Sequence, residues 1–192
     1  MDRCAGSACL RGPQVTAVAG FAAWLGAAVI VLSDGRRGLA LGVAVTAFGF
    51  AALELLNGEW LAAVALLLGG ATAALLRLRI GRSGWGVMPP GSTPRLVLAI
   101  AGGLVALWIA TSVMTGPGAP LRFAAISVLG LMAARVTVAT GQAAMLTAVA
   151  ALALSVAMAA GIGDSSPSPA LYFGAAVVAG GISALRLETN GA

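Results

Sequence analysis

Long apolar stretches separated by short polar segments are the dominant pattern of this sequence. Each stretch approaches the 20 or so residues with which a helix crosses about 30 Å of hydrocarbon. In lipid every backbone polar group must be satisfied within the chain, so stretches of this length predict helices and not strands. We therefore expect an all-α, polytopic transmembrane bundle of seven helices, over residues 15–32, 38–56, 59–76, 95–114, 120–138, 142–161 and 168–186.

Turn-forming residues lie between these stretches and divide the chain into parts. Asp34-Gly35 follows the first stretch, Asn57-Gly58 the second, and Gly116-Pro117-Gly118 the fourth. Such dipeptides and tripeptides are typical of turns. We expect three parts: a polar tail over 1–14, four helices over 15–114 with a long loop at 78–94, and three helices over 115–192.

Composition excludes a soluble domain and charge indicates the topology. Charged residues make up 9% of the chain, against about 25% in soluble domains, and the mean hydropathy is +1.01. All eleven basic residues are arginine, which is typical of a GC-rich bacterial genome, so we expect a bacterial inner (plasma) membrane. Eight of them fall on one side of the seven-helix topology and three on the other, which predicts an outside N-terminus and a cytoplasmic C-terminus. Arginines in short loops are topology signals, so we expect contact with the lipid bilayer and none with nucleic acid.

Small residues within the apolar stretches predict close helix packing. Glycine lets the backbones of two helices approach closely enough for van der Waals contact. The glycines expected at helix contacts are Gly38, Gly42, Gly69, Gly70, Gly180 and Gly181.

Few ionisable side chains fall within the stretches, and none lies at the centre of one. Glu54 and Glu59 flank the Asn57-Gly58 turn, while Arg122 and Arg135 lie near opposite ends of the fifth stretch. Anchoring at the membrane interface is the simpler interpretation of all four. The competing interpretation places Glu54, Glu59 or Arg135 on a proton path or at an interface with another subunit, because ionisable groups within a membrane usually mark function.

No catalytic or cofactor motif is present. The chain contains no phosphate-binding loop, dinucleotide fingerprint or nucleophile elbow, and it has no histidine. Cys4 and Cys9 could form a disulfide on an oxidising side of the membrane, but two thiols are too few for a metal site. We expect no catalytic residue, metal or cofactor in this chain.

Two segments resemble subunits of bacterial NADH:quinone oxidoreductase, complex I. The polar loop Ser33–Arg37, followed by a helix that opens Asn57-Gly58-Glu59-Trp60, is similar to the J subunit, whose third helix starts Gly-Ala-Glu-Phe. Residues 141–150 and the Ala170–Phe173 segment resemble the K subunit. Gly69 stands where the J family has a tyrosine, and Ala143 and Gly180 stand where the K family has its membrane glutamates.

The resemblance implies a fused, reduced J–K-like subunit without its own proton path. We expect a non-catalytic membrane-arm subunit of a complex I-related quinone oxidoreductase or cation-translocating assembly, packed among other membrane subunits and aiding coupling. The alternatives are a small stand-alone transporter or channel, and an integral membrane protein unrelated to that family.

The arginine distribution gives the first testable prediction. Reporter fusions after Gly86 and Arg186 should report cytoplasm, and fusions after Gly58 and Asp164 should report the outside. A cytoplasmic signal after Asp164 would contradict the seven-helix topology.

Overall fold

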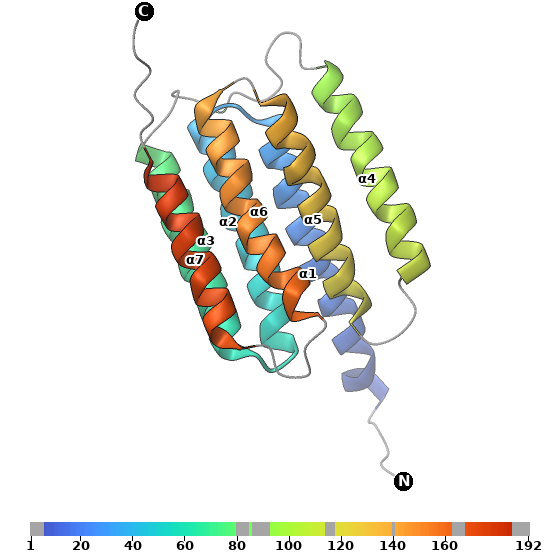
Figure 1. Ribbon diagram of the computed structural model, residues 1–192. Coiled ribbons are helices and arrows are strands. Elements are labelled where there is room, and N and C mark those ends of the chain that lie inside the picture. The colour runs from blue at the N-terminus through green and yellow to red at the C-terminus, as the bar shows by residue number, and fades with distance from the viewer. Residues whose placement is uncertain are drawn as a thin grey trace, which may run out of the picture.

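The computed structural model describes residues 6–79, 85, 93–113, 118–139, 141–162 and 168–185 (Figure 1). All secondary-structure elements in this part of the chain are helices, which confirms the all-α prediction. They are α1 (Gly6–Leu32), α2 (Arg36–Leu56), α3 (Trp60–Arg79), α4 (Thr93–Val113), α5 (Ala119–Val138), α6 (Gln142–Gly161) and α7 (Pro169–Ala184).

Length and surface character identify a multi-pass membrane protein. Five of the described helices, α1, α2, α3, α5 and α6, are long and apolar enough to cross a membrane, and α7 is a shorter apolar helix. Large apolar side chains, including Phe48, Leu104 and Val177, are exposed along the helices. Soluble monomers rarely expose extended apolar surface, so this surface faces lipid or other membrane proteins.

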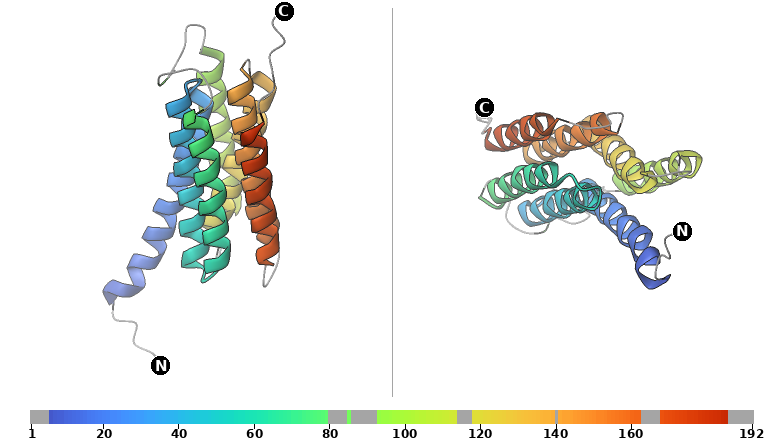
Figure 2. Two further views of the ribbon diagram at one scale, coloured as in Figure 1. Left: turned by 90° about the vertical axis from the view of Figure 1, so that its left-hand side faces the viewer. Right: turned by 90° about the horizontal axis from the view of Figure 1, so that it is seen from below.

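The helices form two layers (Figure 2). One layer contains α1, α2 and α3, and the other contains α4, α5, α6 and α7. Across the layers α1 packs against α5, α2 against α6 and α3 against α7. Because consecutive helices run in opposite directions, the two members of each facing pair run in the same direction. Helix α4 packs mainly against α5 at the edge of its layer.

The first helix begins earlier than the sequence predicts. We expected a polar tail over residues 1–14, whereas the helical backbone of α1 starts at Gly6. A helix that is already formed gains one backbone hydrogen bond for each added residue. The helical turns can therefore continue past the apolar stretch without apolar side chains.

The turn between α2 and α3 is made by Asn57-Gly58, as the sequence predicts. Gly58 has φ +90°, a conformation that glycine adopts at little cost. Its N–H donates to the carbonyl of Leu55 at 3.1 Å, and the N–H of Glu59 donates to the carbonyl of Glu54 at 2.9 Å. This pair of bonds is the Schellman motif, and it satisfies carbonyls that the end of a helix would otherwise leave open.

The closest approach of two helix backbones lies between α1 and α2. A Cβ atom at Gly26 would overlap the backbone nitrogen of Thr46, and one at Gly49 would come within 2.8 Å of the Ala19 carbonyl oxygen. The Thr46 hydroxyl donates to the carbonyl of Gly42 at 2.8 Å. These contacts need glycine on both helices, although neither Gly26 nor Gly49 stood out in the sequence.

The glycines that the sequence marks for packing occupy different environments. A Cβ at Gly42 would meet Ile30, one at Gly69 would meet Ala176 and one at Gly70 would overlap Ala47, all on neighbouring helices. Gly38 lies against Ser33 of the α1–α2 loop. Gly180 has ordinary van der Waals space beside Thr72, and Gly181 faces open space.

The α1–α2 contact gives the second prediction. Gly26→Ala should lower the free energy of unfolding by about 1–3 kcal/mol, because overpacking forces the two backbones apart. Gly130→Ala is the matched control, since nothing lies within 4 Å of a Cβ at that position. Unfolding in mixed detergent micelles, followed by circular dichroism, measures both. Equal stability of the two variants would contradict the close approach.

Candidate functional site

Four of the nine buried polar side chains that the structure describes are hydrogen-bonded within their own helix. Their hydroxyl groups donate to carbonyls three or four residues earlier, and a serine or threonine hydroxyl carries no charge at neutral pH. The buried examples are Thr46 to Gly42, Ser127 to Ala124, Thr147 to Ala143 and Ser155 to Leu152. The ionisable side chains gather instead at the two ends of the bundle, and each end is a candidate site.

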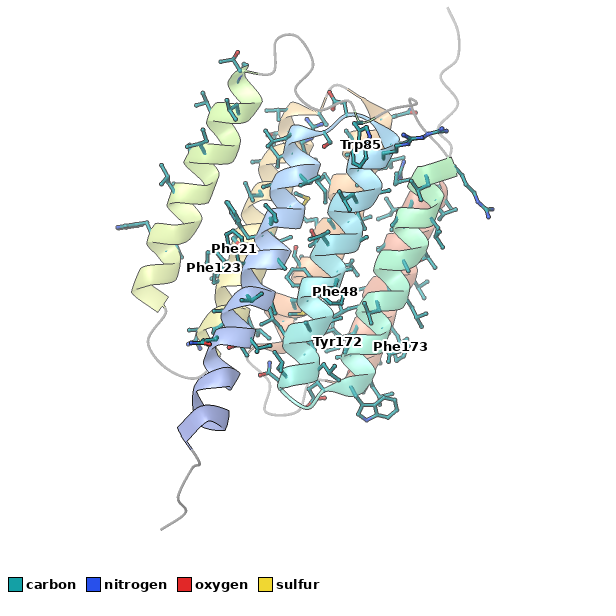
Figure 3. The ribbon with its side chains drawn as sticks, turned by 180° about the vertical axis from the view of Figure 1, so that it is seen from behind. Phe21, Phe48, Trp85, Phe123, Tyr172 and Phe173 are labelled. Atoms are coloured by element: carbon teal, nitrogen blue, oxygen red, sulfur yellow. The ribbon has the colours of Figure 1, made fainter. Side chains whose placement is uncertain are left out.

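At one end, a buried carboxyl group meets the only tyrosine of the chain. The Tyr172 hydroxyl of α7 donates to Glu54 Oε1 of α2 at 3.0 Å, and both side chains are buried. This hydrogen bond joins the two layers across 118 residues of sequence. The pair lies on the side of the bundle where Tyr172 is labelled in Figure 3. We call Glu54, Glu59 and Tyr172 the glutamate cluster.

Glu59 has a structural position in this cluster. Its N–H closes the Schellman motif of α2, and its carbonyl accepts the first helical bond of α3, from the N–H of Ala63 at 3.0 Å. It is thus the N-cap of α3, where a negative charge interacts favourably with the helix dipole. Capping accounts for an acidic residue at this position.

At the opposite end, a buried arginine joins α5 to the loop between α1 and α2. The Arg135 side chain is fully buried and forms an ion pair with Asp34, which is 24% exposed. The same Nη2 atom donates to the backbone carbonyl of Ser33 at 3.2 Å. We call this the arginine-rich end, because among the described helices it carries the residues Arg36, Arg37, Arg77, Arg79 and Arg135.

A second buried arginine makes the matching contact between α3 and α7. Arg77 Nη2 donates to the carbonyl of Ser183, in the last turn of α7, at 3.4 Å. The Arg77 Nε atom and the Ser183 hydroxyl, which are not part of this bond, have no hydrogen-bond partner in the described structure. The last carbonyls of a helix lack internal partners, and a cation there is favourable. Arg77 and Arg135 therefore each cap the carboxyl end of the helix that faces their own.

The structure corrects the interpretation of two ionisable residues. Interfacial anchoring is wrong for Glu54 and Arg135, because both side chains are buried within the protein. Glu59 is half-buried at the turn and Arg122 is half-buried near the start of α5. The structure brings Glu54 and Glu59 together and places Arg135 at the other end of the bundle.

Sequence reasoning missed the partners of these residues. Tyr172, Asp34 and Arg77 were not singled out as site residues. The signal available for Tyr172 was its being the only tyrosine of the chain, at the start of an apolar helix. Cys4 lies outside the described residues, and the side chain of Cys9 is not described, so their role stays open.

The chemistry open to these clusters is limited. The glutamate cluster offers one buried carboxyl group and one phenol, which could exchange a proton locally. Among the described residues no group of three or more histidine, cysteine, aspartate or glutamate side chains could hold a metal ion. Among the described side chains, neither end shows a nucleophile paired with a base.

The ion pair at the arginine-rich end gives the third prediction. Arg135→Gln should lower the free energy of unfolding by about 3 kcal/mol, because it removes one partner of a buried pair. Asp34→Asn in the same chain should recover part of this loss, giving a coupling energy within the range of about 0.5–3 kcal/mol found for contacting residues. Arg79→Gln, at an exposed position of α3, is the control. Strictly additive effects of the two substitutions would argue against the pair.

No protein-family model, curated protein or solved structure matches this chain.

Proposed function

We propose that the chain is a non-catalytic subunit of a larger membrane assembly and packs, helix against helix, on other membrane proteins. The observation that carries this proposal is the outer face of α7. Gly174 and Gly181 lie two helical turns apart on that face, both are exposed, and nothing lies within 4 Å of a Cβ at either position. Val177 between them is 74% exposed.

Glycine on a free helix face needs a reason. It lowers helix stability by about 1 kcal/mol relative to alanine, and a lipid-facing position gains nothing from it. Elsewhere in the bundle glycines such as Gly26, Gly49 and Gly70 permit close approach within the chain. Small residues recur where transmembrane helices associate, so Gly174 and Gly181 favour a partner helix against α7.

The resemblance of the chain to the J and K subunits supports a particular kind of assembly. We propose a complex I-related quinone oxidoreductase or cation-translocating complex of a bacterial inner membrane. In it the N-terminus faces the outside and the arginine-rich end faces the cytoplasm. Helices α2 and α3 hold the J-like segment, α6 and α7 hold the two K-like segments, and α7 carries the free glycine face.

A stand-alone transporter is the second candidate, and one observation favours it. Buried ionisable groups within a membrane are functional by default, and Glu54 with Tyr172 forms such a group. Glu54 lies in the last turn of α2, however, and the buried hydroxyls farther along the bundle hold no charge. Proton flux from the purified chain in liposomes, lost on Glu54→Gln, would favour this candidate over the subunit.

The fourth prediction tests the partner helix. After extraction in mild detergent, the tagged chain should migrate on a native gel within a complex, and mass spectrometry should identify other membrane subunits. Gly174→Leu and Gly181→Leu should each release the chain from that complex, because leucine blocks close approach to α7. Both variants should fold normally, since neither site has internal neighbours.

Gly130→Leu is the matched control: Gly130 is also exposed with open space around it, but it is the only glycine within α5, whereas Gly174 and Gly181 form a pair on one face of α7. It should leave the complex intact. Recovery of the unaltered chain as a monodisperse monomer without membrane partners would overturn the proposal.

A further inference from the structure

Helix α4 leaves an apolar groove between itself, α1 and α5. The groove encloses a cavity of about 460 Å³, and α4 stands at the edge of the bundle beside it (Figure 1). Its wall on α1 runs from Phe21 through Trp24 to Leu32, its wall on α4 runs from Leu96 to Leu104, and α5 contributes Phe123.

The groove opens sideways, toward the surroundings of the bundle. Phe21, Ile100 and Leu104 line it and are each more than half exposed, whereas Trp24 and Leu32 are half-buried in its wall. Phe21 packs on Trp24 with their ring centroids 5.2 Å apart. Phe21 and Phe123 lie near the middle of the height of the bundle (Figure 3), so the aromatic side chains form the inner end of the groove.

The length of the groove matches one leaflet of a bilayer. From Phe21 to Leu32 the wall on α1 spans eleven residues, or about 16 Å at 1.5 Å per residue. Half of a hydrocarbon core of about 30 Å is about 15 Å. The groove starts at the arginine-rich end, where α1 ends and α4 begins, and stops near mid-height. That is the extent of a single acyl chain.

The lining excludes water and favours hydrocarbon. Every residue of the wall is apolar, and water enters a cavity only where it finds polar partners. An empty apolar cavity of this size would forgo the dispersion contacts of its whole lining. A chain that spans a bilayer is surrounded by acyl chains, which can enter through the open side.

The charge at the arginine-rich end, where the groove begins, indicates the kind of lipid. Arg36 and Arg37 begin α2 four residues beyond Leu32, and Arg36 is half-buried while Arg37 is exposed. Apart from Asp34, which is paired with Arg135, the described side chains at this end are basic or neutral. Basic residues at the membrane surface attract anionic headgroups by about 1 kcal/mol each, an effect that falls off within a Debye length.

The geometry points to a lipid site: the α1–α4–α5 groove holds one acyl chain of an anionic phospholipid from the leaflet at the arginine-rich end. The lipid fills the groove between α1 and α4 and adds to the packing of these two helices. This site is independent of the partner helix proposed for α7, because the two lie at opposite edges of the bundle (Figure 2).

The fifth prediction uses Trp24 as the reporter. In the full chain carrying Trp60→Phe, Trp85→Phe and Trp108→Phe, Trp24 is the one remaining tryptophan. Phosphatidylglycerol brominated on its acyl chain, titrated into the protein in mild detergent, should quench Trp24 and saturate at one lipid per chain. Brominated phosphatidylcholine should reach half-maximal quenching of Trp24 only at a severalfold higher concentration, because it lacks the net negative charge.

Two matched variants decide whether the lipid lies in the groove. Ala28→Leu places a larger side chain in the groove. It should raise the lipid concentration needed for half-maximal quenching about tenfold, the loss of affinity expected when two lipid methylenes are displaced. Ala71→Leu makes the same change at an exposed position of α3 and should leave the titration unaltered. Gly103→Leu, also in the lining, repeats the test should Ala28→Leu fail to fold.

Three results would overturn the inference. The first is quenching that does not saturate, and the second is equal quenching in the Ala28→Leu and Ala71→Leu variants. The third comes from a photoreactive amino acid at Leu104 in cells. Adducts to a protein would show that a partner helix covers the groove, whereas adducts to phospholipid support the assignment.

Discussion

The bundle depends on one constraint: hydrocarbon offers no hydrogen bonds, so the chain must satisfy its own polar groups. Helix bodies do so through their backbones, and Thr46, Ser127 and Ser155 donate to carbonyls of their own helices. The ends of helices are harder to satisfy. The Asn57-Gly58 turn does so locally, through a Schellman motif. At the arginine-rich end Arg135 and Arg77 donate across the layers to the carboxyl ends of α1 and α7. The requirement to satisfy helix ends therefore also fixes which helices face each other.

Packing within the layers follows from the same solvent. Lipid tails are as apolar as leucine, so helices associate through close van der Waals contact and not through a hydrophobic driving force between them. Gly26 and Gly49 bring α1 onto α2, and Gly70 brings α3 onto α2. The free face of α7 and the groove beside α4 are two places in the described structure where this packing is not completed within the chain. The proposed partner helix and the proposed lipid each complete one of them.

The glutamate cluster shows how a functional pattern and a structural role can coincide. The sequence marks Glu59 as a candidate for a proton path, yet its backbone ends α2 and begins α3. Glu54 joins the layers through Tyr172. A residue that both holds two helices in place and can carry a proton is suited to a coupling element in a larger assembly. It is less suited to a complete proton path, since the buried serines and threonines between the two ends of the bundle carry no charge.

The sequence alone determined the seven helices, their limits within a few residues, and the Asn57-Gly58 turn. Apolar runs and turn residues act on their immediate neighbours, so these features can be read locally. The single large difference, the start of α1 at Gly6, arose because helix propagation does not need apolar side chains.

Only the tertiary structure decided that Glu54 meets Tyr172, that Arg135 meets Asp34, and that Gly26 and not Gly181 contacts another helix of the chain. Membrane helices are apolar on every side, so the pattern that distinguishes the inner face of a soluble helix is missing. Which face turns inward was settled by shape and by hydrogen bonds between residues more than 100 positions apart.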